Sequence, residues 1–279
     1  MDHLAESQTP RALSLLPPFP AIAHKILALA GHDDSSAPEV GRLIRLDPTF
    51  SAELLRCANS ALFGVRRQVS SLTQAVALLG MERVKSMATF VAVNHMVRSS
   101  KHAPALRKIW VHCVVTAIIM DEAARLCGLE RDSAYTTGLL HNLGALGLMS
   151  AYPDEYPQVL EDAGGGAIDV LCAERARFEI DHCTAGAHLA KEWQFPKELQ
   201  DAIATHHEDP APHRGRLAEL LRICRRLTDT LGYAASAATS TWPLAELTAL
   251  LPHSPDSWLC GTAEAARAQI DAKLADSPL

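Results

Sequence analysis

Helix-start signals recur along the chain, and they constrain the fold of this sequence more than any other feature does. Ser36 and Glu39 form a capping box, and Asp47 followed by Pro48 places an N-cap before a proline at the first helical position. Behind these signals, apolar residues recur at every fourth position, as one buried helix face requires: Phe50, Leu54, Ala58 and Leu62. No stretch alternates with the period of two that is typical of a strand. The sequence therefore predicts an all-α fold.

Further start and stop signals predict how the helices are grouped. Ser71 and Gln74 form a second capping box, a long helix over 103–127 ends at Gly128, and "AGGGA" at 163–167 is the clearest break. Three more helices are predicted to begin near Asp181, Pro196 and Gly215. The expected organisation has three parts: an N-terminal helical bundle (1–100), a second helical bundle (101–231), and an irregular segment with one amphipathic helix (232–279).

Composition and charge are those of an ordinary globular chain without a broad basic surface. Hydrophobic residues make up 48% and charged residues 21%. The formal net charge of −6 argues against broad electrostatic capture of nucleic acid or anionic membranes. The seven cysteines are scattered without a Cys-x-x-Cys pair, so they are interpreted as reduced thiols. Because the N-terminal residues also lack the apolar core of a signal peptide, we expect a cytoplasmic protein.

Arginines gather on the helix that is predicted to begin near Gly215. Arg222, Arg225 and Arg226 share one face of this helix, and leucines occupy the opposite face. This pattern is typical of an amphipathic surface helix whose charged side is solvated. Nucleic-acid binding through these arginines is therefore an unfavoured alternative.

The stretch "GLLHNLGALGL" at 138–148 combines strong apolar character with two adjacent polar residues, His141 and Asn142. It lies in the longest uncharged run, 133–153, which is interpreted as a buried helix over 133–151 and a turn, not as a membrane span. Burying an imidazole and an amide is costly unless each finds a hydrogen-bond partner. These two residues are therefore the first candidates for a polar site inside the core.

Seven polar residues are candidates for one shared site. Taken singly, each has an ordinary explanation: His112 as a core histidine, His182 as a solvent-facing residue of a first helical turn, and Asp229 as the i, i+4 partner of Arg225. Taken together, imidazoles on separate helices can converge on a divalent ion, with a carboxylate completing the site. The candidates are His112, His141, Asn142, His182, His206, His207 and Asp229.

The order of these residues resembles the HD superfamily of metal-dependent phosphohydrolases: a histidine, a His-Asp pair, further histidines and a late aspartate. Position 142 is asparagine where that superfamily has its signature aspartate, and Ala145 stands where catalytic relatives often carry a lysine. A binuclear site needs a bridging anion between metals about 3.5–4 Å apart, and an amide does not supply that charge. The resemblance thus implies a degenerate site, whose polar residues persist as a hydrogen-bonded His–Asn–Asp network.

The N-terminal half specifies the branch of that superfamily. Five short motifs in order resemble HDOD proteins, and together with "GLLHNLGALGL" and "HCTAGAHLAKEW" they extend the resemblance over residues 11–231. The motifs are Leu16-Pro17, Asp47-Pro48, Leu54-Leu55-Arg56, Asn59-Ser60 and Leu79-Gly80. The resemblance implies a multi-helix HDOD fold in which the N-terminal bundle packs on an HD-like bundle. HDOD proteins are mostly regarded as non-enzymatic regulators, often linked to bacterial signalling, cyclic-di-GMP networks, motility and biofilm control.

We therefore expect a non-enzymatic bacterial signalling protein that holds no metal and acts by binding a partner protein or a nucleotide such as a cyclic dinucleotide. The alternative is an active phosphohydrolase that holds a divalent metal such as Fe, Mn or Mg at the histidines. The expected partner-binding surface is the loop 59–71, with the groove between the two bundles. Its candidate residues are Asn59, Ser60, Arg66 and Arg67. An alternative reading has Asn59 and Ser60 only capping a helix end, with the two arginines solvated.

Overall fold

The computed structural model describes ten segments of the chain, and every regular element within them is a helix. The described segments are 10–16, 36–45, 48–59, 69–81, 83–84, 87–88, 103–164, 169–210, 216–236 and 242–275. The expected all-α fold is confirmed for these residues. No described helix combines the length and the apolar character that crossing a membrane requires.

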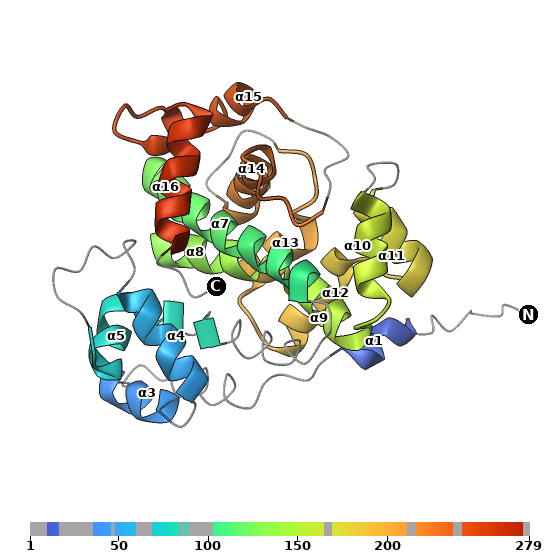
Figure 1. The fold of residues 1–279 in the computed structure, drawn as a ribbon, viewed down its shortest axis with the longest axis horizontal. Helices are drawn as coiled ribbons and strands as arrows, with labels where there is room; N and C mark the ends of the chain where they lie inside the picture. Colours follow the sequence, from blue (N-terminus) through green and yellow to red (C-terminus); the bar gives the residue numbers. More distant parts are fainter. Residues whose placement is uncertain are drawn as a thin grey trace, which may run out of the picture.

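The described residues before position 80 form four helices: α1 (Arg11–Leu15), α3 (Ala37–Ile44), α4 (Pro48–Ala58) and α5 (Leu72–Leu79). The capping box of α3 forms as expected, since the Glu39 carboxylate accepts hydrogen bonds from the Ser36 amide at 3.0 Å and from its hydroxyl at 2.9 Å. Gly80 ends α5 at φ 80°, a left-handed conformation that favours glycine. Both α3 and α4 pack against α5 (Figure 1).

Eight helices lie in the described residues between 103 and 231. They are α7 (Ala103–Cys127), α8 (Arg131–Leu140), α9 (Leu143–Ala151), α10 (Tyr156–Gly164), α11 (Val170–Phe178), α12 (His182–Glu192), α13 (Lys197–Thr205) and α14 (Leu217–Thr230). The long helix α7 lies at the centre and packs against α8 and α14 (Figure 1). On the side of α10 and α11, α12 packs against α9 and α13, and α13 in turn packs against α14.

The C-terminal residues return to α7. They contain α15 (Leu244–Thr248), the 3-10 turn η2 (Trp258–Cys260) and α16 (Ala263–Ala275). α16 packs against α7 and buries Ala266, Ile270 and Leu274, which recur every fourth residue as one helix face (Figure 1). The segment 232–279 therefore contributes an element to the core around α7.

Buried ion pairs tie the segment after α5 to the larger group of helices. Arg83, which is 6% exposed, contacts Asp121 of α7 at 2.6 Å and Asp132 of α8 at 2.7 Å. Its guanidinium carbon also lies 4.7 Å from the centre of the Tyr135 ring. Arg131 pairs with the second oxygen of Asp121, so that carboxylate is bound on both sides.

The run 133–151 is not one helix, and that prediction is wrong. α8 ends at Leu140, His141 takes the C-cap position, Asn142 takes the N-cap position of α9, and α9 begins at Leu143. The break turns the chain within the buried run and places His141 and Asn142 at the junction of two helices. The other break that was expected, "AGGGA", falls largely outside the described residues.

Glycines set how closely the helices around this junction approach. A Cβ on Gly138 would lie 2.6 Å from the Ala117 Cα, so α8 packs with its backbone almost directly on α7. A Cβ on Gly144 would lie 1.9 Å from the His182 carbonyl oxygen and 2.4 Å from the Gly186 amide nitrogen. The crossing of α9 and α12 at Gly144 and Gly186 therefore brings the first turn of α12, with His182, against the junction.

Candidate functional site

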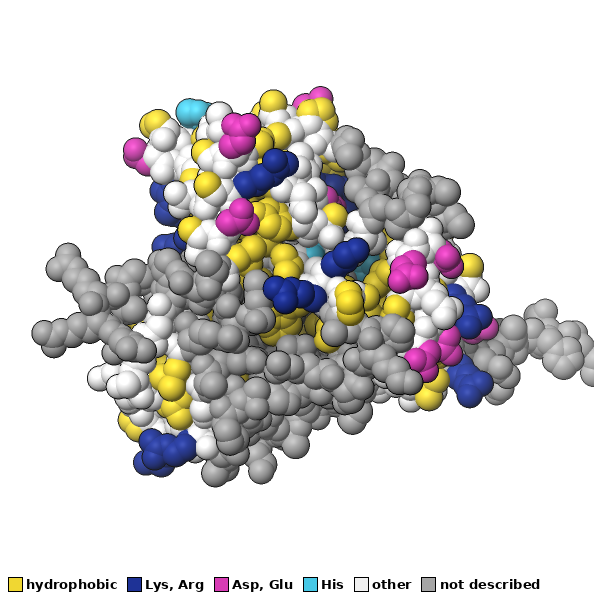
Figure 2. All heavy atoms as spheres, in the orientation of Figure 1, with side chains coloured by type: hydrophobic (Ala, Val, Ile, Leu, Met, Phe, Trp, Pro, Cys, Tyr) yellow, Lys and Arg dark blue, Asp and Glu magenta, His cyan; other side chains and the backbone are white. Residues whose placement is uncertain are grey.

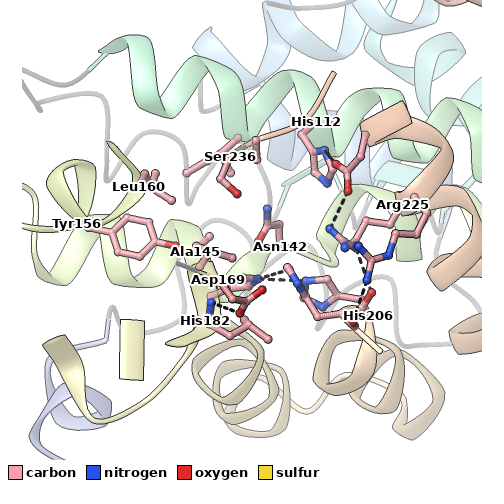
Figure 3. A pocket seen from close by; sticks show the side chains of 17 residues that line it. His112, Asn142, Ala145, Tyr156, Leu160, Asp169, His182, His206, Arg225 and Ser236 are labelled. Atoms are coloured by element: carbon pink, nitrogen blue, oxygen red, sulfur yellow. Dashed lines mark hydrogen bonds and ion pairs between the residues drawn. The ribbon is translucent and has the colours of Figure 1, made fainter. Parts of the chain in front are cut away.

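A cavity of about 100 Å³ opens where α7, the junction between α8 and α9, α12, the end of α13, and α14 meet (Figure 3). By the usual measure of about 10–15 Å³ per water, it has room for several waters or one phosphate-sized group. Figure 2 shows histidine side chains inside the hollow near the centre of that face, beside Lys or Arg side chains. Six of the seven sequence candidates line it: His112, Asn142, His182, His206, His207 and Asp229.

The seventh candidate, His141, is not among the lining residues, but its ring lies next to two of the other histidine rings. Its ring centroid is 5.2 Å from that of His112 and 5.0 Å from that of His206. The rings of His182, His206 and His207 continue the series, with centroids 4.7–5.2 Å apart. The structure thus brings together all five histidines, which we call the histidine cluster: His112, His141, His182, His206 and His207. Only His207 of the five is not fully buried.

Backbone carbonyls fix the tautomers of three cluster histidines. The Nδ1 atoms of His141 and His206 lie 2.7 Å from the carbonyl oxygens of Gly138 and Ile203, and His112 Nδ1 lies 3.0 Å from the carbonyl oxygen of Tyr233. A carbonyl only accepts, so each Nδ1 carries the proton and each Nε2 is left with a lone pair. His141 Nε2 is buried and has no hydrogen-bond partner among the described residues.

A buried carboxylate holds the fourth histidine. Glu174 on α11 is 0% exposed and lies 2.8 Å from His182 Nδ1. It also accepts hydrogen bonds from the His182 amide at 2.8 Å and from the Tyr156 hydroxyl at 2.7 Å. The ordinary explanation of His182 as a solvent-facing residue is therefore wrong, since His182, the first residue of α12, is buried, whereas its placement in the shared cluster agrees with the structure.

Three Nε2 atoms converge in the cavity. His182 Nε2 is 3.2 Å from His206 Nε2 and 3.0 Å from His207 Nε2. His206 Nε2 is an acceptor, since its Nδ1 carries the proton, and a neutral His182 bonded to Glu174 presents a lone pair in the same way. Lone pairs this close repel each other unless a proton or a metal cation lies between the nitrogens.

Burial and neighbouring charges lower the pKa of four histidines of the cluster and raise that of the fifth. Burial, reinforced by neighbouring cationic groups, lowers the pKa of His141, His206 and His207 well below its usual value. Burial also lowers the pKa of His112, with Asp229 opposing this in part. For His182, the effect of burial is outweighed by the Glu174 carboxylate, and the pKa is raised well above its usual value.

The aspartate that comes last in the sequence order, Asp229, forms an ion pair with the buried Arg225. Arg225 on α14 donates from its NH1 nitrogen to Asp229 Oδ2 at 3.0 Å and from Nε to the His206 carbonyl at 3.1 Å. The second oxygen of Asp229 lies 3.6 Å from His112 Nδ1. The i, i+4 ion pair that the sequence suggested therefore forms, and it places a positive charge in the wall of the cavity.

The solvated arginine face expected for α14 is wrong. Arg225 is 6% exposed, and the side chains of Arg222 and Arg226 are mostly buried and pair with Glu208 at 2.6 Å and Asp209 at 3.7 Å. The face is polar because it borders the cavity and the end of α13, not because it meets water. Paired, inward-facing guanidinium groups also do not offer a surface for phosphates of nucleic acid.

Asn142 does not join the hydrogen-bonded His–Asn–Asp network that was expected. Its side-chain oxygen is buried and has no partner among the described residues, and it makes no cap bond to α9. Asp229 contacts Arg225 and His112 instead. Asn142 therefore lies in the wall of the cavity with a buried side-chain oxygen that no described residue satisfies (Figure 3).

The residues support one metal ion better than two. The bridging carboxylate of a binuclear site is replaced by the neutral Asn142, and Asp229 is engaged by Arg225. Three convergent Nε2 atoms are, in contrast, a donor set that suits a single transition metal, and the contact of Glu174 with His182 Nδ1 is the usual orienting contact of a metal-bound histidine.

Sequence reasoning missed four residues of the site. Glu174 and Tyr156 hold His182, Arg225 neutralises Asp229, and Asp169, the N-cap of α11, lines the cavity. Asp169 and Arg225 carried local signals, as a helix-start residue and as the i, i+4 partner of Asp229. Nothing near Glu174 or Tyr156 in the sequence indicates that they meet.

The candidates in the loop 59–71 fall mainly outside the described residues, which include neither Ser60, Arg66 nor Arg67. Asn59 is described, and its side chain bonds the Leu55 carbonyl at 2.7 Å and both the amide and the carbonyl of Val69, at 2.6 and 2.8 Å. Asn59 thus joins the end of α4 to Val69.

Comparison with known families matches the HDOD domain model to residues 16–209. The chain belongs to the HDOD family. A curated relative, an uncharacterized protein of Treponema pallidum (strain Nichols), is 26% identical over 198 residues, which cover 70% of this chain. The matched part is 38% of that relative's length.

Solved structures share the HDOD fold over nearly the whole chain. A candidate phosphohydrolase from Shewanella amazonensis SB2B is 25% identical with a TM-score of 0.69, covering 96% of this chain and 97% of that chain. An HDOD domain protein of unknown function from Geobacter sulfurreducens is 22% identical with a TM-score of 0.71, covering 95% and 97%. The second likeness concerns the fold alone.

Proposed function

We propose that this HDOD chain is a non-enzymatic signalling protein of the bacterial cytoplasm, which acts by binding a partner protein or a nucleotide. One observation carries the proposal: neither carboxylate position of an HD-type site is free to bridge two metals. Position 142 is an amide, and the Asp229 carboxylate is bound by the buried Arg225 at 3.0 Å. A second dication at this place would meet a fixed guanidinium and no bridging anion.

The experiment is a hydrolysis assay on the purified chain with cyclic dinucleotides and a generic phosphodiester, with Mn²⁺, Fe²⁺ or Mg²⁺ added in turn. We expect no turnover above that of the His141→Ala variant, because the missing parts are the bridging anion and the cation at position 145. Turnover that is lost in His141→Ala would establish the alternative, a metal-dependent phosphohydrolase. The convergent Nε2 atoms and the Shewanella likeness are the observations that favour this alternative.

The proposed binding surface is the loop 59–71 and the groove between the N-terminal helices and the HD-like helices. Asn59 supports it, because two of its three side-chain hydrogen bonds join the first residue of this segment to Val69. Arg66 and Arg67 supply positive charge for an acidic partner surface or a phosphate.

The two possible surfaces give opposite results in a capture experiment with a native lysate and with immobilised cyclic-di-GMP. If the loop binds, replacing both Arg66 and Arg67 by alanine weakens capture and leaves the melting temperature nearly unchanged, since exposed charges add little to stability. If capture survives that change and is lost in His206→Ala/His207→Ala, the cavity is the binding site. Capture of cyclic-di-GMP would connect the chain to control of motility or biofilm.

A further inference from the structure

We propose that the C-terminal helix α16 keeps the cavity closed beside His112 by holding residues 231–236 in place, and that release of α16 opens the cavity. We call residues 231–236 the wall segment. The proposal goes beyond the proposed signalling function and does not depend on it. It concerns residues that lie outside 16–209, the part of the chain that matches the HDOD domain model.

The wall segment lies between the cavity and the surface. Ala235 and Ser236 line the cavity, and Figure 3 shows Ser236 between Leu160 and His112 in that view. Residues 233–236 are half-buried, so the same short segment also reaches the surface. Movement of these few residues is therefore enough to widen the cavity.

The wall segment makes few hydrogen bonds of its own. The turn after α14 closes with two, from the Gly232 amide to the Asp229 carbonyl at 3.0 Å and from the Tyr233 amide to the Thr228 carbonyl at 3.1 Å. Gly232 is exposed and has a φ of 93°, a left-handed conformation that favours glycine. Residues 234–236 form no hydrogen bond with another described residue. The position of the segment therefore depends on contacts from other elements.

Helix α16 supplies two such contacts, which we call the latch contacts. Arg267 Nε donates to the Leu231 carbonyl at 2.9 Å, and the Tyr233 hydroxyl donates to the Asp271 carboxylate. Arg267 and Asp271 are four residues apart, so they lie on one face of α16. Because Leu231 and Tyr233 flank Gly232, α16 holds the turn on both sides of its left-handed residue.

Tyr233 connects the latch contacts to the inside of the cavity. While its hydroxyl binds Asp271, its backbone carbonyl accepts a hydrogen bond from His112 Nδ1 at 3.0 Å. The same nitrogen lies 3.6 Å from the Asp229 carboxylate, at the end of α14 where the turn starts. Displacement of Tyr233 therefore removes a partner of a buried histidine and moves the wall beside it.

α16 is attached to the rest of the molecule through a small apolar face. Its buried side chains, among those described, are Ala266, Ile270 and Leu274. Figure 1 shows the helix at the edge of the molecule, beside α7. Elements with few buried apolar contacts open locally at a lower free energy than the core does. α16 can therefore separate from α7 while the helices around the cavity stay folded.

The test is the rate at which diethylpyrocarbonate, a reagent for neutral imidazoles, labels the histidines of the full chain, measured by mass spectrometry. Tyr233→Phe/Arg267→Met removes both latch contacts and keeps the ring and the side-chain stem. We expect labelling of His112 and His206 to rise about tenfold, the equivalent of about 1.4 kcal/mol for two partly exposed hydrogen bonds. Amide hydrogen exchange of residues 231–236 should rise with it. Tyr233→Phe alone, the milder change, should give about threefold.

Three references separate local opening from unfolding. His141 does not line the cavity and His253 is already exposed, so neither should be labelled faster in the double variant. Lys273→Met removes a charge from the same helix at a residue with no hydrogen bond or ion pair to the described wall segment, and should be labelled like the native chain. Native-like labelling of the double variant overturns the proposal. So does a rise at His141 equal to that at His112, or an equal effect of Lys273→Met.

Discussion

Replacing Gly144 by alanine should disturb both the fold and the histidine cluster, because this glycine lies where the backbones of α9 and α12 meet. The added Cβ would lie 1.9 Å from the His182 carbonyl oxygen and 2.4 Å from the Gly186 amide nitrogen. Both atoms belong to the backbone, so no side chain can rotate aside. The two helices must separate by about 1 Å to reach a tolerable contact.

The size of the effect follows from that separation. Overpacking a core costs about 1–3 kcal/mol, and a backbone-to-backbone clash belongs at the upper end. A gap of about 1 Å also forfeits up to half of the dispersion energy of the contacts along the crossing. Because alanine has a higher helix propensity than glycine, the substitution also stabilises α9 by about 1 kcal/mol. We expect a net loss of about 2–3 kcal/mol, and at about 2–4 °C per kcal/mol the melting temperature should fall by about 4–12 °C.

Thermal unfolding followed by circular dichroism measures this loss, and histidine ¹⁵N NMR shows whether the surroundings of His182 have changed. The matched control is Gly41→Ala on α3, whose Cβ would meet Thr73 at 3.2 Å, a contact that needs only a few tenths of an ångström of relief. Gly41→Ala should change stability by less than about 1 kcal/mol. A Gly144→Ala protein as stable as the native chain would refute the close crossing of α9 and α12.

Three further changes test the electrostatics of the cavity. Asn142→Asp should lower the free energy of unfolding of the metal-free chain by about 1–3 kcal/mol and create no efficient enzyme, because burial raises the pKa of the new carboxyl and position 145 still lacks a cation; an unchanged melting temperature with strong turnover contradicts this. Arg225→Met leaves the Asp229 carboxylate without its guanidinium and should cost about 3–5 kcal/mol, measured by urea unfolding; a cost below 1 kcal/mol would mean that the pair is solvated. Four cluster histidines have lowered folded pKa values, so the unfolded chain binds more protons below about pH 6.5, and the stability of the chelator-treated protein should fall from about pH 6.5 to 5.5. His182, whose pKa is raised, opposes the other four only above about pH 6.5 and makes a constant contribution below it, so a stability that rises between about pH 6.5 and 5.5 would show that the four lowered values are wrong.

The helices were predictable where local signals and burial agree. Ser36 with Glu39 and Asp181 each mark the start of an observed helix, because their side chains satisfy free amides whatever the surroundings. Pro196 also marks a helix start, without a cap bond, because its fixed φ suits the position before a first helical turn. The break at His141 was not predictable from local signals. The run around it carries no proline, and apolar residues continue on both sides, so a continuous helix satisfies the same pattern.

The sequence predicted which histidines come together in the site, but not the charged residues that set their pKa values. The order of histidines along the chain identified all five rings that meet. Glu174 was missed because a buried glutamate looks like any surface glutamate until its partners, Tyr156 and His182, are placed around it. Arg225 was assigned to solvent because a polar helix face meets water in most proteins, whereas here it meets a polar cavity.

The asparagine at position 142 affects the two kinds of metal chemistry differently. A two-metal centre depends on a bridging anion, so one amide removes it, and Arg225 on Asp229 removes the carboxylate that could compensate. A one-metal site on His182, His206 and His207 needs neither carboxylate, and it draws its orientation from Glu174 on a different helix. Loss of hydrolysis therefore carries no implication of metal loss.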